Sequence, residues 1–257
     1  MPRLKKRWGQ HHLASGRSCA PLVEFLRPAG ESVVEIGPGG GVLSQELSAA
    51  GGRVVGWEVD LEWAFALRRR LAPGRMALVA GDALRISWPH LARRGPVLAA
   101  GNLPYNVATP IVERLLPHRR AVPRAAFLVQ REVAERLVAG PGDPDYGYLS
   151  VLVAAWAEAR LLGVVRRGAF RPPPKVDGAF VGLTLREPPL PDEEMVDFRK
   201  TVAAAFALRR KTLRNSLASA WGRPAAERAL AAAGLDDRVR AEALGIDELV
   251  SLHRARG

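Results

Sequence analysis

Short apolar runs alternate with amphipathic stretches along the first two thirds of the chain. Five runs have the length and the aliphatic content of buried strands: Val33–Ile36, Val54–Val59, Met76–Ala80, Val97–Ala100 and Ala125–Gln130. Between them, apolar residues recur with helical spacing over Val42–Ala50, Leu61–Leu71, Thr109–Leu116 and Arg131–Ala139. Because short apolar strands alternate with helices, the pattern predicts an α/β fold with a parallel sheet covered on both faces.

The pattern changes after residue 139. A loop rich in glycine and proline, Ala139–Gly147, precedes an apolar segment near Tyr148–Trp156 that we interpret as a helix. Two further strand-like segments follow, Arg160–Arg166 and Ala179–Arg186. They are joined through the proline-rich Arg171–Gly178, which predicts an extended loop.

A change of composition near residue 187 predicts a second domain. The string Glu187–Glu194 has the prolines and acidic residues of a linker. The segment Val196–Arg256 is rich in alanine, leucine and arginine, with helical spacing and no strand pattern. We therefore predict an α/β domain over residues 1–187 and a small all-α domain over residues 188–257.

Length and composition place the chain among globular proteins. Its 257 residues are 48% hydrophobic and 25% charged, which excludes wholesale disorder and a fibrous repeat. No uncharged apolar run reaches the roughly 18 residues that a membrane-spanning helix needs. The basic N-terminus lacks the apolar stretch of a secretory signal peptide, and the lone Cys19 cannot form an internal disulfide. We therefore expect a soluble, cytoplasmic protein.

Positive charge is concentrated in two stretches of the chain. The net charge is +12; residues 1–30 carry six basic groups and one acid, and residues 198–223 carry seven basic groups and no acid. Two basic patches on a neutral body indicate a polyanionic partner such as a nucleic-acid backbone. The alternative is a merely solvated surface, since 33 arginines against 5 lysines fit a codon bias. That bias does not explain stretches without acids.

The second basic stretch has helical spacing over Phe198–Leu217. As one helix it would carry an apolar stripe of Val202, Phe206, Leu213 and Leu217. Lys200, Arg210, Lys211 and Arg214 would lie along one flank of that stripe, and Arg209 would border the other. We interpret these cations as contacts for RNA phosphates, and a solvated helix is the alternative.

A glycine-rich turn, Val33–Gly41, separates the first predicted strand from the first helix. In a parallel sheet such a turn is where a nucleotide-like ligand meets the carboxyl edge. A dinucleotide fingerprint needs Gly or Ala at its sixth position, and here Gly37 and Gly39 are followed by Val42. The loop therefore fits a dinucleotide poorly, and a tight turn without a ligand is the other alternative.

Acidic residues follow the next two predicted strands. Glu58 ends the second strand and can accept hydrogen bonds from both hydroxyls of a ribose. Asp82, followed by Ala83, ends the third strand and can accept from an adenine amino group. Each acid by itself is equally compatible with an ordinary helix cap. Glycine, glutamate and aspartate at three successive strand ends favour a cofactor site.

The sequence GNLPY, Gly101–Tyr105, follows the fourth strand at the same sheet edge. The Asn102 side-chain oxygen and the Leu103 carbonyl can each accept one hydrogen of an exocyclic amine such as that of adenine. Pro104 forces the residue before it into an extended conformation, which aims that carbonyl outward. Tyr105 offers a ring on which a base can stack, worth about 1–3 kcal/mol. A turn with a core tyrosine is the alternative.

Several motifs together resemble one known family. They are Lys5–Leu13, Val33–Ser44, the GDA of Gly81–Ala83, Gly101–Pro110, Leu128–Leu137, Tyr146–Leu152, Phe170–Phe180 and Ala205–Leu217. The chain resembles the ribosomal RNA adenine N6-dimethyltransferases that use S-adenosylmethionine, and specifically the branch that acts on small-subunit RNA. This resemblance implies a Rossmann-like methyltransferase sheet, the catalytic domain, with a small helical RNA-binding domain after it. It also implies dimethylation of two adjacent adenosines in a hairpin near the 3′ end of that RNA, late in ribosome assembly.

The resemblance implies roles for individual residues. The expected cofactor-binding residues are His11, Leu13, Gly37, Gly39, Glu58, Asp82, Ala83 and Asn102. The residues expected at the reacting amine are Asn102, Leu103, Pro104 and Tyr105. Tyr105 and Phe170 would flank the target adenine, and Arg209, Arg210, Lys211 and Arg214 would bind RNA. We expect a small-subunit ribosomal particle as the partner, and a monomeric protein.

One motif departs from the family. Related sequences usually read GQNFL where this chain has Gln10, His11, His12 and Leu13. His11 replaces an amide used near the cofactor and His12 replaces an aromatic ring, although a neutral imidazole can still stack or form hydrogen bonds. Adjacent histidines point apart and no third ligand is visible, so we predict no metal site.

Other functions compete with this interpretation. Within the family, the alternative is a large-subunit methyltransferase that confers macrolide-type resistance. Outside catalysis, the alternative is an assembly or transcription factor that keeps the fold for RNA binding. A DNA adenine methyltransferase is a further alternative, although no DNA-reading domain is visible. The C-terminal motifs favour the small-subunit branch, and the intact glycine, acid and NLPY motifs favour an enzyme.

Overall fold

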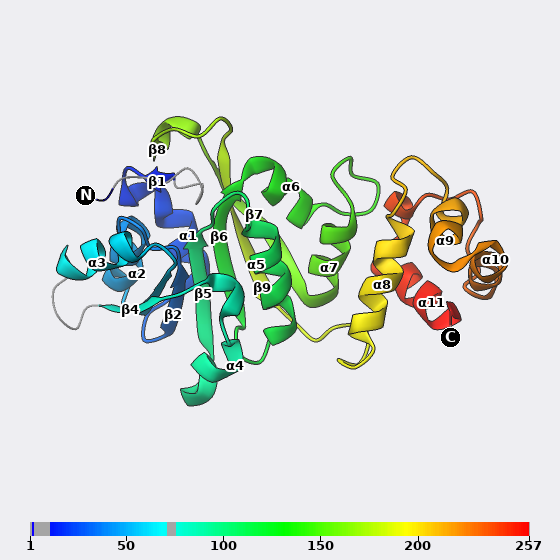
Figure 1. Cartoon of the computed structure of the whole chain (residues 1–257), viewed down its shortest axis with the longest axis horizontal. Coiled ribbons are helices and arrows are strands. Elements are labelled where there is room, and N and C mark those ends of the chain that lie inside the picture. The colour runs from blue at the N-terminus through cyan, green and yellow to red at the C-terminus, as the bar shows by residue number, and fades with distance from the viewer. Residues whose placement is uncertain (1, 3–10, 71–75, 257) are drawn as a thin grey trace. The chain divides into compact units, whose positions relative to one another are not determined.

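A computed structural model describes residue 2 and residues 11–70 and 76–256, so most of the N-terminal motif Lys5–Leu13 lies outside the described residues (Figure 1). Two compact units make up the chain. The first comprises Met1–Ala134 and Ala157–Arg186, and the second comprises Glu135–Trp156 and Glu187–Gly257.

The first unit contains a seven-stranded sheet with the order β4-β3-β2-β5-β6-β9-β7. Its strands are β2 (Ser32–Ile36), β3 (Arg53–Glu58), β4 (Met76–Ala80), β5 (Val97–Asn102), β6 (Arg124–Gln130), β7 (Ala157–Val165) and β9 (Gly178–Leu185). The first five strands are parallel, as predicted, while β9 runs antiparallel to both β6 and β7. Two short strands, β1 (His12–Leu13) and β8 (Phe170–Arg171), form a separate antiparallel pair.

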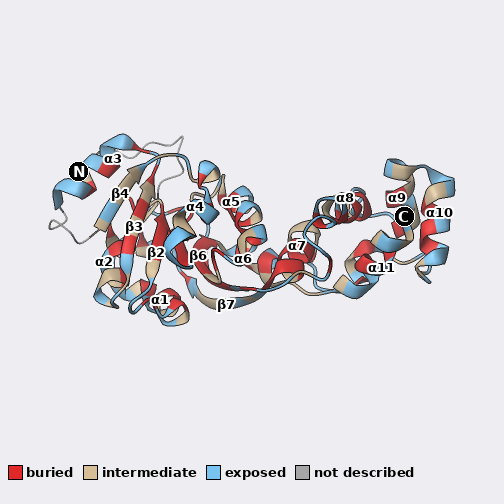
Figure 2. Cartoon of the chain, turned by 90° about the horizontal axis from the view of Figure 1, so that it is seen from below, coloured by how far each residue is buried: buried red, intermediate tan, exposed pale blue. Residues whose placement is uncertain are grey.

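Helices cover both faces of this sheet, as predicted. They are α1 (Ala20–Leu26), α2 (Val42–Ala49), α3 (Leu61–Arg70), α4 (Trp88–Leu91), α5 (Ala108–Leu115) and α6 (Arg131–Val138). Helices α1 and α2 lie on one face, and α4 and α5 lie on the other (Figure 2). Figure 2 also shows the buried residues gathered along the strands, which explains why the strands read as continuous apolar runs.

The core between the sheet and helices α1 and α2 is aliphatic. Leu22 and Leu26 of α1 and Leu47 of α2 are fully buried against Val33 and other strand residues. The sequence analysis did not single out α1, which begins with Pro21 at its first turn and is followed by Arg27 in the left-handed region with φ 47°. This core fixes the central strand β2, from which the glycine loop departs.

The second unit is helical. It contains α7 (Tyr148–Trp156), α8 (Met195–Ala205), α9 (Leu213–Trp221), α10 (Arg223–Ala232) and α11 (Ile246–Arg256). The sequence analysis places residues 135–156 in the first domain, whereas their contacts group them with the helices after residue 187. The Tyr146 hydroxyl donates to the Leu244 carbonyl at 2.8 Å, and the Tyr146 ring meets that of Phe206 edge to face. The apolar α7 likewise packs against α8 and α11.

The single helix predicted over Phe198–Leu217 is wrong, because α8 ends at Ala205 and α9 begins at Leu213. The Thr212 side chain caps α9 by accepting from the Asn215 N–H at 3.5 Å. The Ser216 hydroxyl accepts from the Leu208 N–H at 3.1 Å and donates to the Ala204 carbonyl at 2.9 Å. These local hydrogen bonds to side chains compete with a continuous helix and stabilise the break.

Candidate functional site

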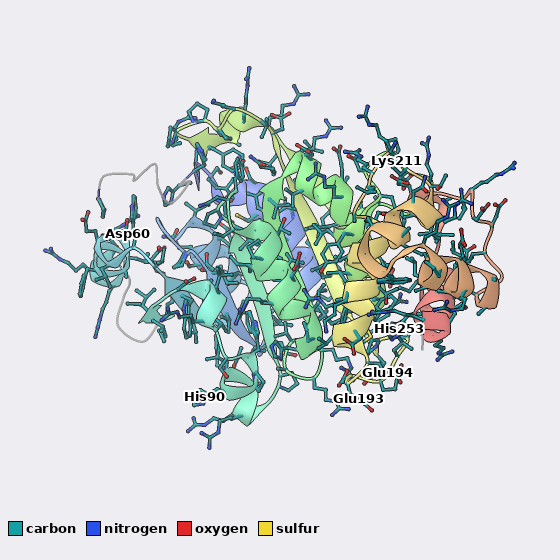
Figure 3. All side chains as sticks on the ribbon, turned by 45° about the vertical axis from the view of Figure 1, so that its right-hand side comes forward. Asp60, His90, Glu193, Glu194, Lys211 and His253 are labelled. Atoms are coloured by element: carbon teal, nitrogen blue, oxygen red, sulfur yellow. The ribbon has the colours of Figure 1, made fainter. Side chains whose placement is uncertain are left out.

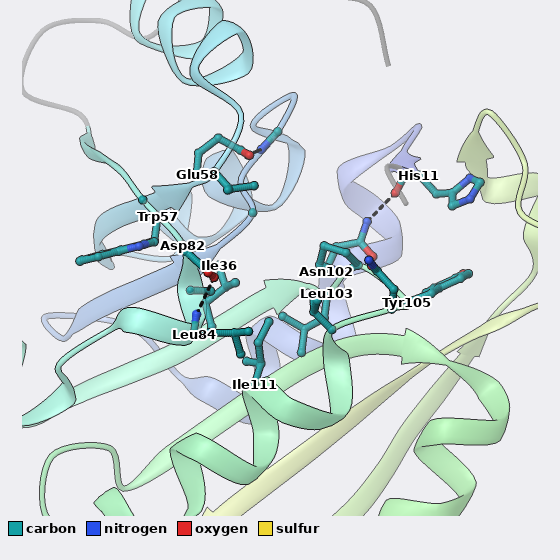
Figure 4. Close-up of a pocket in the computed structure, with 18 of the residues that line it drawn as sticks. His11, Ile36, Trp57, Glu58, Asp82, Leu84, Asn102, Leu103, Tyr105 and Ile111 are labelled. Atoms are coloured by element: carbon teal, nitrogen blue, oxygen red, sulfur yellow. Dashed lines mark hydrogen bonds between the residues drawn. The ribbon is translucent and has the colours of Figure 1, made fainter. Parts of the chain in front are cut away.

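A cavity lies at the carboxyl ends of β2, β3, β4 and β5 in the first unit (Figure 4). Parallel strands bring these ends to one edge of the sheet, where ligands of such folds bind. Of the residues predicted to form the site, those that line the cavity are His11, Gly37, Gly39, Glu58, Asp82, Ala83, Asn102, Leu103, Pro104 and Tyr105. Residues from five separate segments of the chain therefore meet in one place.

The glycine loop between β2 and α2 is held in conformations that require glycine. Gly37 and Gly39 have φ values of 67° and 48°, in the left-handed region that side chains disfavour. The Gly37 N–H donates to the Trp57 carbonyl at 2.9 Å, which ties the loop to β3. A Cβ atom at Gly39 would collide with the His12 ring. The backbone can therefore approach a ligand closely at this loop.

Glu58 holds the glycine loop from the end of β3. Its side chain is buried, with Oε2 accepting from the Gly39 N–H and Oε1 accepting from the Asp60 N–H, each at 3.0 Å. Burial raises the pKa of Glu58, while these backbone hydrogen bonds act in the opposite direction. A carboxylate oxygen has two lone pairs, so Glu58 can also accept from a ligand hydroxyl in the cavity.

Asp60 was missed by the sequence analysis. It is buried next to the N-terminus of α3, and its Oδ1 accepts from the Glu62 N–H at 3.1 Å (Figure 3). An aspartate directly before a helix is a common N-cap signal, and this signal was available in the sequence. Its backbone N–H fixes one oxygen of Glu58, so Asp60 orients the carboxylate at the cavity.

Asp82 and Ala83 lie where β4 ends, on the opposite wall of the cavity from the NLPY segment (Figure 4). Asp82 is exposed, and its Oδ1 accepts from the Leu84 N–H at 2.9 Å. This bond caps the short turn Ala83–Arg85, so the helix-cap interpretation is correct for one oxygen of Asp82. The carboxylate still borders the cavity, where it can accept from a ligand.

Asn102 ends β5, and its side-chain amide is fixed by a distant segment. Its Nδ2 donates to the His11 carbonyl at 2.7 Å, which leaves Oδ1 as the acceptor of this amide (Figure 4). The next residue, Leu103, is buried, and its N–H donates to the Leu128 carbonyl at 2.9 Å. Both bonds position the GNLPY segment as a rigid wall of the cavity.

Tyr105 presents its ring at the same wall. It stacks on His11 with ring centroids 5.6 Å apart and an interplanar angle of 30°. The Nδ1 atom of His11 in turn lies 2.9 Å from the Pro172 carbonyl oxygen. Burial and the nearby Asp177 raise the pKa of Tyr105 to about 12, so its phenol is neutral at physiological pH.

Two of the residues predicted to contact the cofactor or the target adenine do not line this cavity. Phe170 is fully buried and Leu13 is 6% exposed, and both belong to the hydrophobic core. The pairing of β1 with β8 sets Leu13 opposite Phe170, so both side chains point to the same inner face. The ring that faces Tyr105 in this structure is His11, and flanking of an adenine by Phe170 stays a prediction.

The predicted RNA-binding cations belong to the second unit. Arg209, Arg210 and Lys211 are exposed in the loop between α8 and α9, and Figure 3 shows Lys211 at the outer surface. Arg214 lies on α9, where its Nη1 forms an ion pair with Asp237 Oδ2 at 2.5 Å. Lys200 on α8 pairs with Asp197 at 2.8 Å. The loop cations are therefore better placed for a phosphate than the two helix cations.

Apolar residues that the sequence analysis missed complete the cavity. Ile36, Trp57, Val59, Leu84 and Ile111 line it beside the polar groups. Each sits one or two positions from a polar residue at a strand end, or on the helix that follows. Apolar residues at such positions resemble ordinary core residues, so sequence patterns alone do not distinguish them.

The part of the chain that the structure describes contains neither a metal-binding cluster nor a membrane-spanning helix. Within it, no three His, Cys, Asp or Glu side chains gather closely enough to hold a metal ion. In the same residues, no helix combines the length and hydropathy that a membrane span requires.

Comparisons with known proteins give matches across almost the whole chain. A sequence model of the family described as ribosomal RNA adenine dimethylase matches residues 1–255. A Myxococcus xanthus protein named ribosomal RNA small subunit methyltransferase A is 40% identical over 260 residues, which cover 99% of this chain and 92% of the relative. The protein of that name from Anaeromyxobacter dehalogenans is 42% identical over 268 residues, which cover 99% of this chain and 94% of the relative.

Solved structures give the same architecture. The 23S rRNA methyltransferase ErmE is 26% identical with a TM-score of 0.70, over 95% of this chain and 98% of that one. A dimethyladenosine transferase from Plasmodium falciparum has a TM-score of 0.76 at 20% identity, over 94% of this chain and 96% of that one. At this identity the similarity concerns the fold alone.

Proposed function

The chain belongs to the ribosomal RNA adenine dimethylase family, and from this premise we propose that it dimethylates the N6 amino groups of two adjacent adenosines in the 3′-terminal hairpin of small-subunit RNA, late in ribosome assembly. It is an rRNA adenine dimethyltransferase that uses S-adenosylmethionine. The observation that carries this proposal is the cavity itself, which joins a glycine loop, two strand-end carboxylates and the NLPY segment.

The residues of the cavity fit the cofactor. Glu58 would accept hydrogen bonds from the ribose hydroxyls and Asp82 from the adenine amino group, and the glycine loop would let the backbone come close to the ligand. The apolar walls, including Trp57 and Ile111, suit the flat face of a base. When bound, S-adenosylmethionine supplies an electrophilic methyl group.

The NLPY segment prepares the target amine. The Asn102 Oδ1 and the Leu103 carbonyl oxygen each accept one amino hydrogen, which draws the nitrogen lone pair out of conjugation with the ring and toward the methyl donor. Tyr105 stacks on the target base and holds it flat against this pair of acceptors. No ionised base is needed, because the amine becomes acidic only once it is alkylated. A base in duplex or hairpin RNA must leave its stack to reach such a site.

The second unit supports binding to the RNA backbone. The exposed Arg209, Arg210 and Lys211 supply phosphate contacts from one loop, and Arg214 adds a contact that competes with its ion pair to Asp237. We also propose that the substrate is a small-subunit particle in the cytoplasm, that the protein acts as a monomer, and that no metal takes part.

A large-subunit activity is the alternative within the family, and it is not favoured. The relatives at 40% and 42% identity carry a small-subunit name, whereas the 23S rRNA methyltransferase ErmE is 26% identical. Methyl transfer from radiolabelled S-adenosylmethionine tests the proposed activity and this alternative. The substrates are unmethylated small subunits, large subunits and duplex DNA. We expect label only in the small-subunit RNA, with two methyl groups on each of two adenosines. Label in large subunits or DNA instead would contradict the proposal.

A further inference from the structure

We propose that His12 is a positioning residue of the cofactor site, whose neutral ring holds the glycine loop by accepting the Gly40 backbone N–H. A proton on the ring then releases the loop and weakens cofactor binding. This inference rests on the proposed function, because it assumes that S-adenosylmethionine occupies the cavity.

The His12 ring packs directly over the loop. Its Nδ1 lies 3.1 Å from the Gly40 nitrogen and accepts the N–H, and its ring stacks on Trp63 of α3 with centroids 4.5 Å apart and an interplanar angle of 27°. The same ring occupies the space where Gly39 would carry a side chain. His12 therefore joins β1, the glycine loop and α3, and it borders the cavity.

This hydrogen bond fixes the tautomer of His12. Because Nδ1 accepts the Gly40 N–H, the proton of the neutral ring sits on Nε2. Nε2 is buried and has no hydrogen-bond partner among the described residues. Burial, with a smaller contribution from His11, lowers the pKa of His12, so the ring is neutral near pH 7.

Protonation removes the only acceptor that His12 offers to the loop. An imidazolium has N–H donors on both ring nitrogens, so Nδ1–H would point at the Gly40 N–H and the two donors would repel. Gly39, the neighbouring residue, is held from the other side by Glu58. Loss of the His12 contact leaves the Gly40 N–H without its acceptor, although Gly37 and Gly39 stay bonded to Trp57 and Glu58. The loop is then less firmly fixed at Gly40, where the cofactor needs a preformed backbone.

Other charged groups face His12 and define the controls. His11 is its chain neighbour, Glu35 lines the same small cavity, and Arg171 is its partner across the β1–β8 pair. Behind the loop lie Glu58 and Asp60, and the Arg70 Nη1 is 3.4 Å from the Gly40 carbonyl. Burial raises the pKa of Glu35 to about 8, so Glu35 also titrates in an accessible range.

Isothermal calorimetry with S-adenosylmethionine on the full-length protein tests the proposal at about pH 7.5 and about pH 5.5. The wild type is expected to lose affinity on acidification, by up to about tenfold for each pH unit below the His12 pKa, because His12 must release one proton before the cofactor binds. His12→Phe keeps the stacking on Trp63 but cannot accept or take up a proton. Its affinity is expected to be a few-fold weaker than that of the wild type at the higher pH, and to fall less than the wild-type affinity on acidification.

Two further measurements separate His12 from its neighbours and from general unfolding. Glu35→Gln is expected to keep the wild-type loss of affinity, because the loss arises from His12. Nitrogen-15 NMR of histidine-labelled protein is expected to show His12 as the Nε2–H tautomer near neutral pH, without cofactor. Circular dichroism at the lower pH is expected to show the same folded protein in all variants.

The outcomes distinguish this inference from the proposed function. An equal loss of affinity in wild type and His12→Phe, or an Nδ1–H tautomer, would overturn the role of His12 while leaving the cofactor site intact. No binding of S-adenosylmethionine to any variant at either pH would instead contradict the proposed function.

Discussion

Glu58 and Asp82 both border the cavity, but they differ in how much of the site depends on them. Glu58 is buried and holds Gly39 and Asp60, whereas Asp82 is exposed and caps one turn. Losing a charged hydrogen-bond partner costs about 1.5–3 kcal/mol, or roughly tenfold to a hundredfold in affinity. In calorimetry, the loss of affinity is expected to lie within this range for Asp82→Ala, and at its upper end or beyond for Glu58→Ala. Wild-type affinity for S-adenosylmethionine in both variants would contradict the assignment.

We propose that Asn102 and Tyr105, which line the cavity, contact the target base and not the RNA backbone. Asn102→Ala removes an acceptor for the reacting amine, and Tyr105→Ala removes the face on which the base stacks. Single-turnover methyl transfer is expected to fall by at least about a hundredfold in Asn102→Ala, since an interaction specific to the transition state is lost. RNA association is expected to remain within a few-fold, because phosphate contacts dominate it. Unchanged single-turnover rates would place the reacting adenine elsewhere.

Glu35, on the central strand β2, is a buried acid whose ionisation affects stability. Burial raises its pKa to about 8, against about 4.3 in an unfolded chain. The folded protein therefore holds this proton more tightly, so the contribution of Glu35 to stability is fully present below about pH 4.3 and is lost as the pH rises toward about 8. Glu35→Gln cannot ionise, and its melting temperature is expected to depend less on pH between about 5 and 8. Identical melting temperatures for the wild type and Glu35→Gln at every pH would show that Glu35 is not a neutral acid in the folded protein.

At the scale of elements, the loop between α8 and α9 carries three cations, Arg209, Arg210 and Lys211, for which the described residues provide no carboxylate partner. Each lost phosphate contact reduces the log–log salt slope by about 0.7 for single strands and 0.9 for duplexes. Replacing all three by Gln is expected to flatten the slope of small-subunit binding by about 2 to 3 units. Lys200→Gln is the control, because Lys200 pairs with Asp197 and its replacement is expected to leave the slope unchanged. An unaltered slope in the triple variant would show that the loop is only a solvated surface.

The Ser216 hydroxyl makes two of the hydrogen bonds that stabilise the break between α8 and α9. Ser216 bonds to Leu208 on the loop and to Ala204 on α8, and it is buried. Ser216→Ala leaves the Leu208 N–H without its partner, at a cost of about 1–3 kcal/mol. Chemical denaturation is expected to show this loss, and cofactor affinity is expected to stay unchanged. Wild-type stability would mean that the loop holds its shape by other contacts.

At the scale of the whole molecule, the chain consists of two compact units, and the cavity belongs to the first. We therefore expect the cofactor to stabilise the first unit and not the second. A ligand that binds only the folded state slows local opening where it binds. Adding S-adenosylmethionine is expected to slow amide hydrogen exchange in the glycine loop and the NLPY segment of the first unit. The exchange of α9, α10 and α11 is expected to stay the same. Equal protection of both units would show that they unfold as one.

Local pattern determined most of the fold and the polar part of the site. The predicted strands and helices of the sheet are confirmed to within a few residues at their ends, from Val33–Ile36 to Ala179–Arg186. This succeeds because apolar periodicity and turn residues reflect contacts close in sequence. The glycine loop, Glu58, Asp82 and Asn102 were also visible from the sequence, since parallel strands must bring their carboxyl ends to one edge.

Contacts between distant residues were decided only by the tertiary structure. The pairing of β1 with β8 buries Phe170 and brings His11 onto Tyr105, and no local pattern carries that information. The same holds for His12 on Gly40, and for residues 135–156, which group with the helices after residue 187. The sequence by itself therefore specified which residues could do the chemistry. The tertiary structure decided which of them meet, because burial and hydrogen bonding between remote segments are satisfied only when the whole chain is packed.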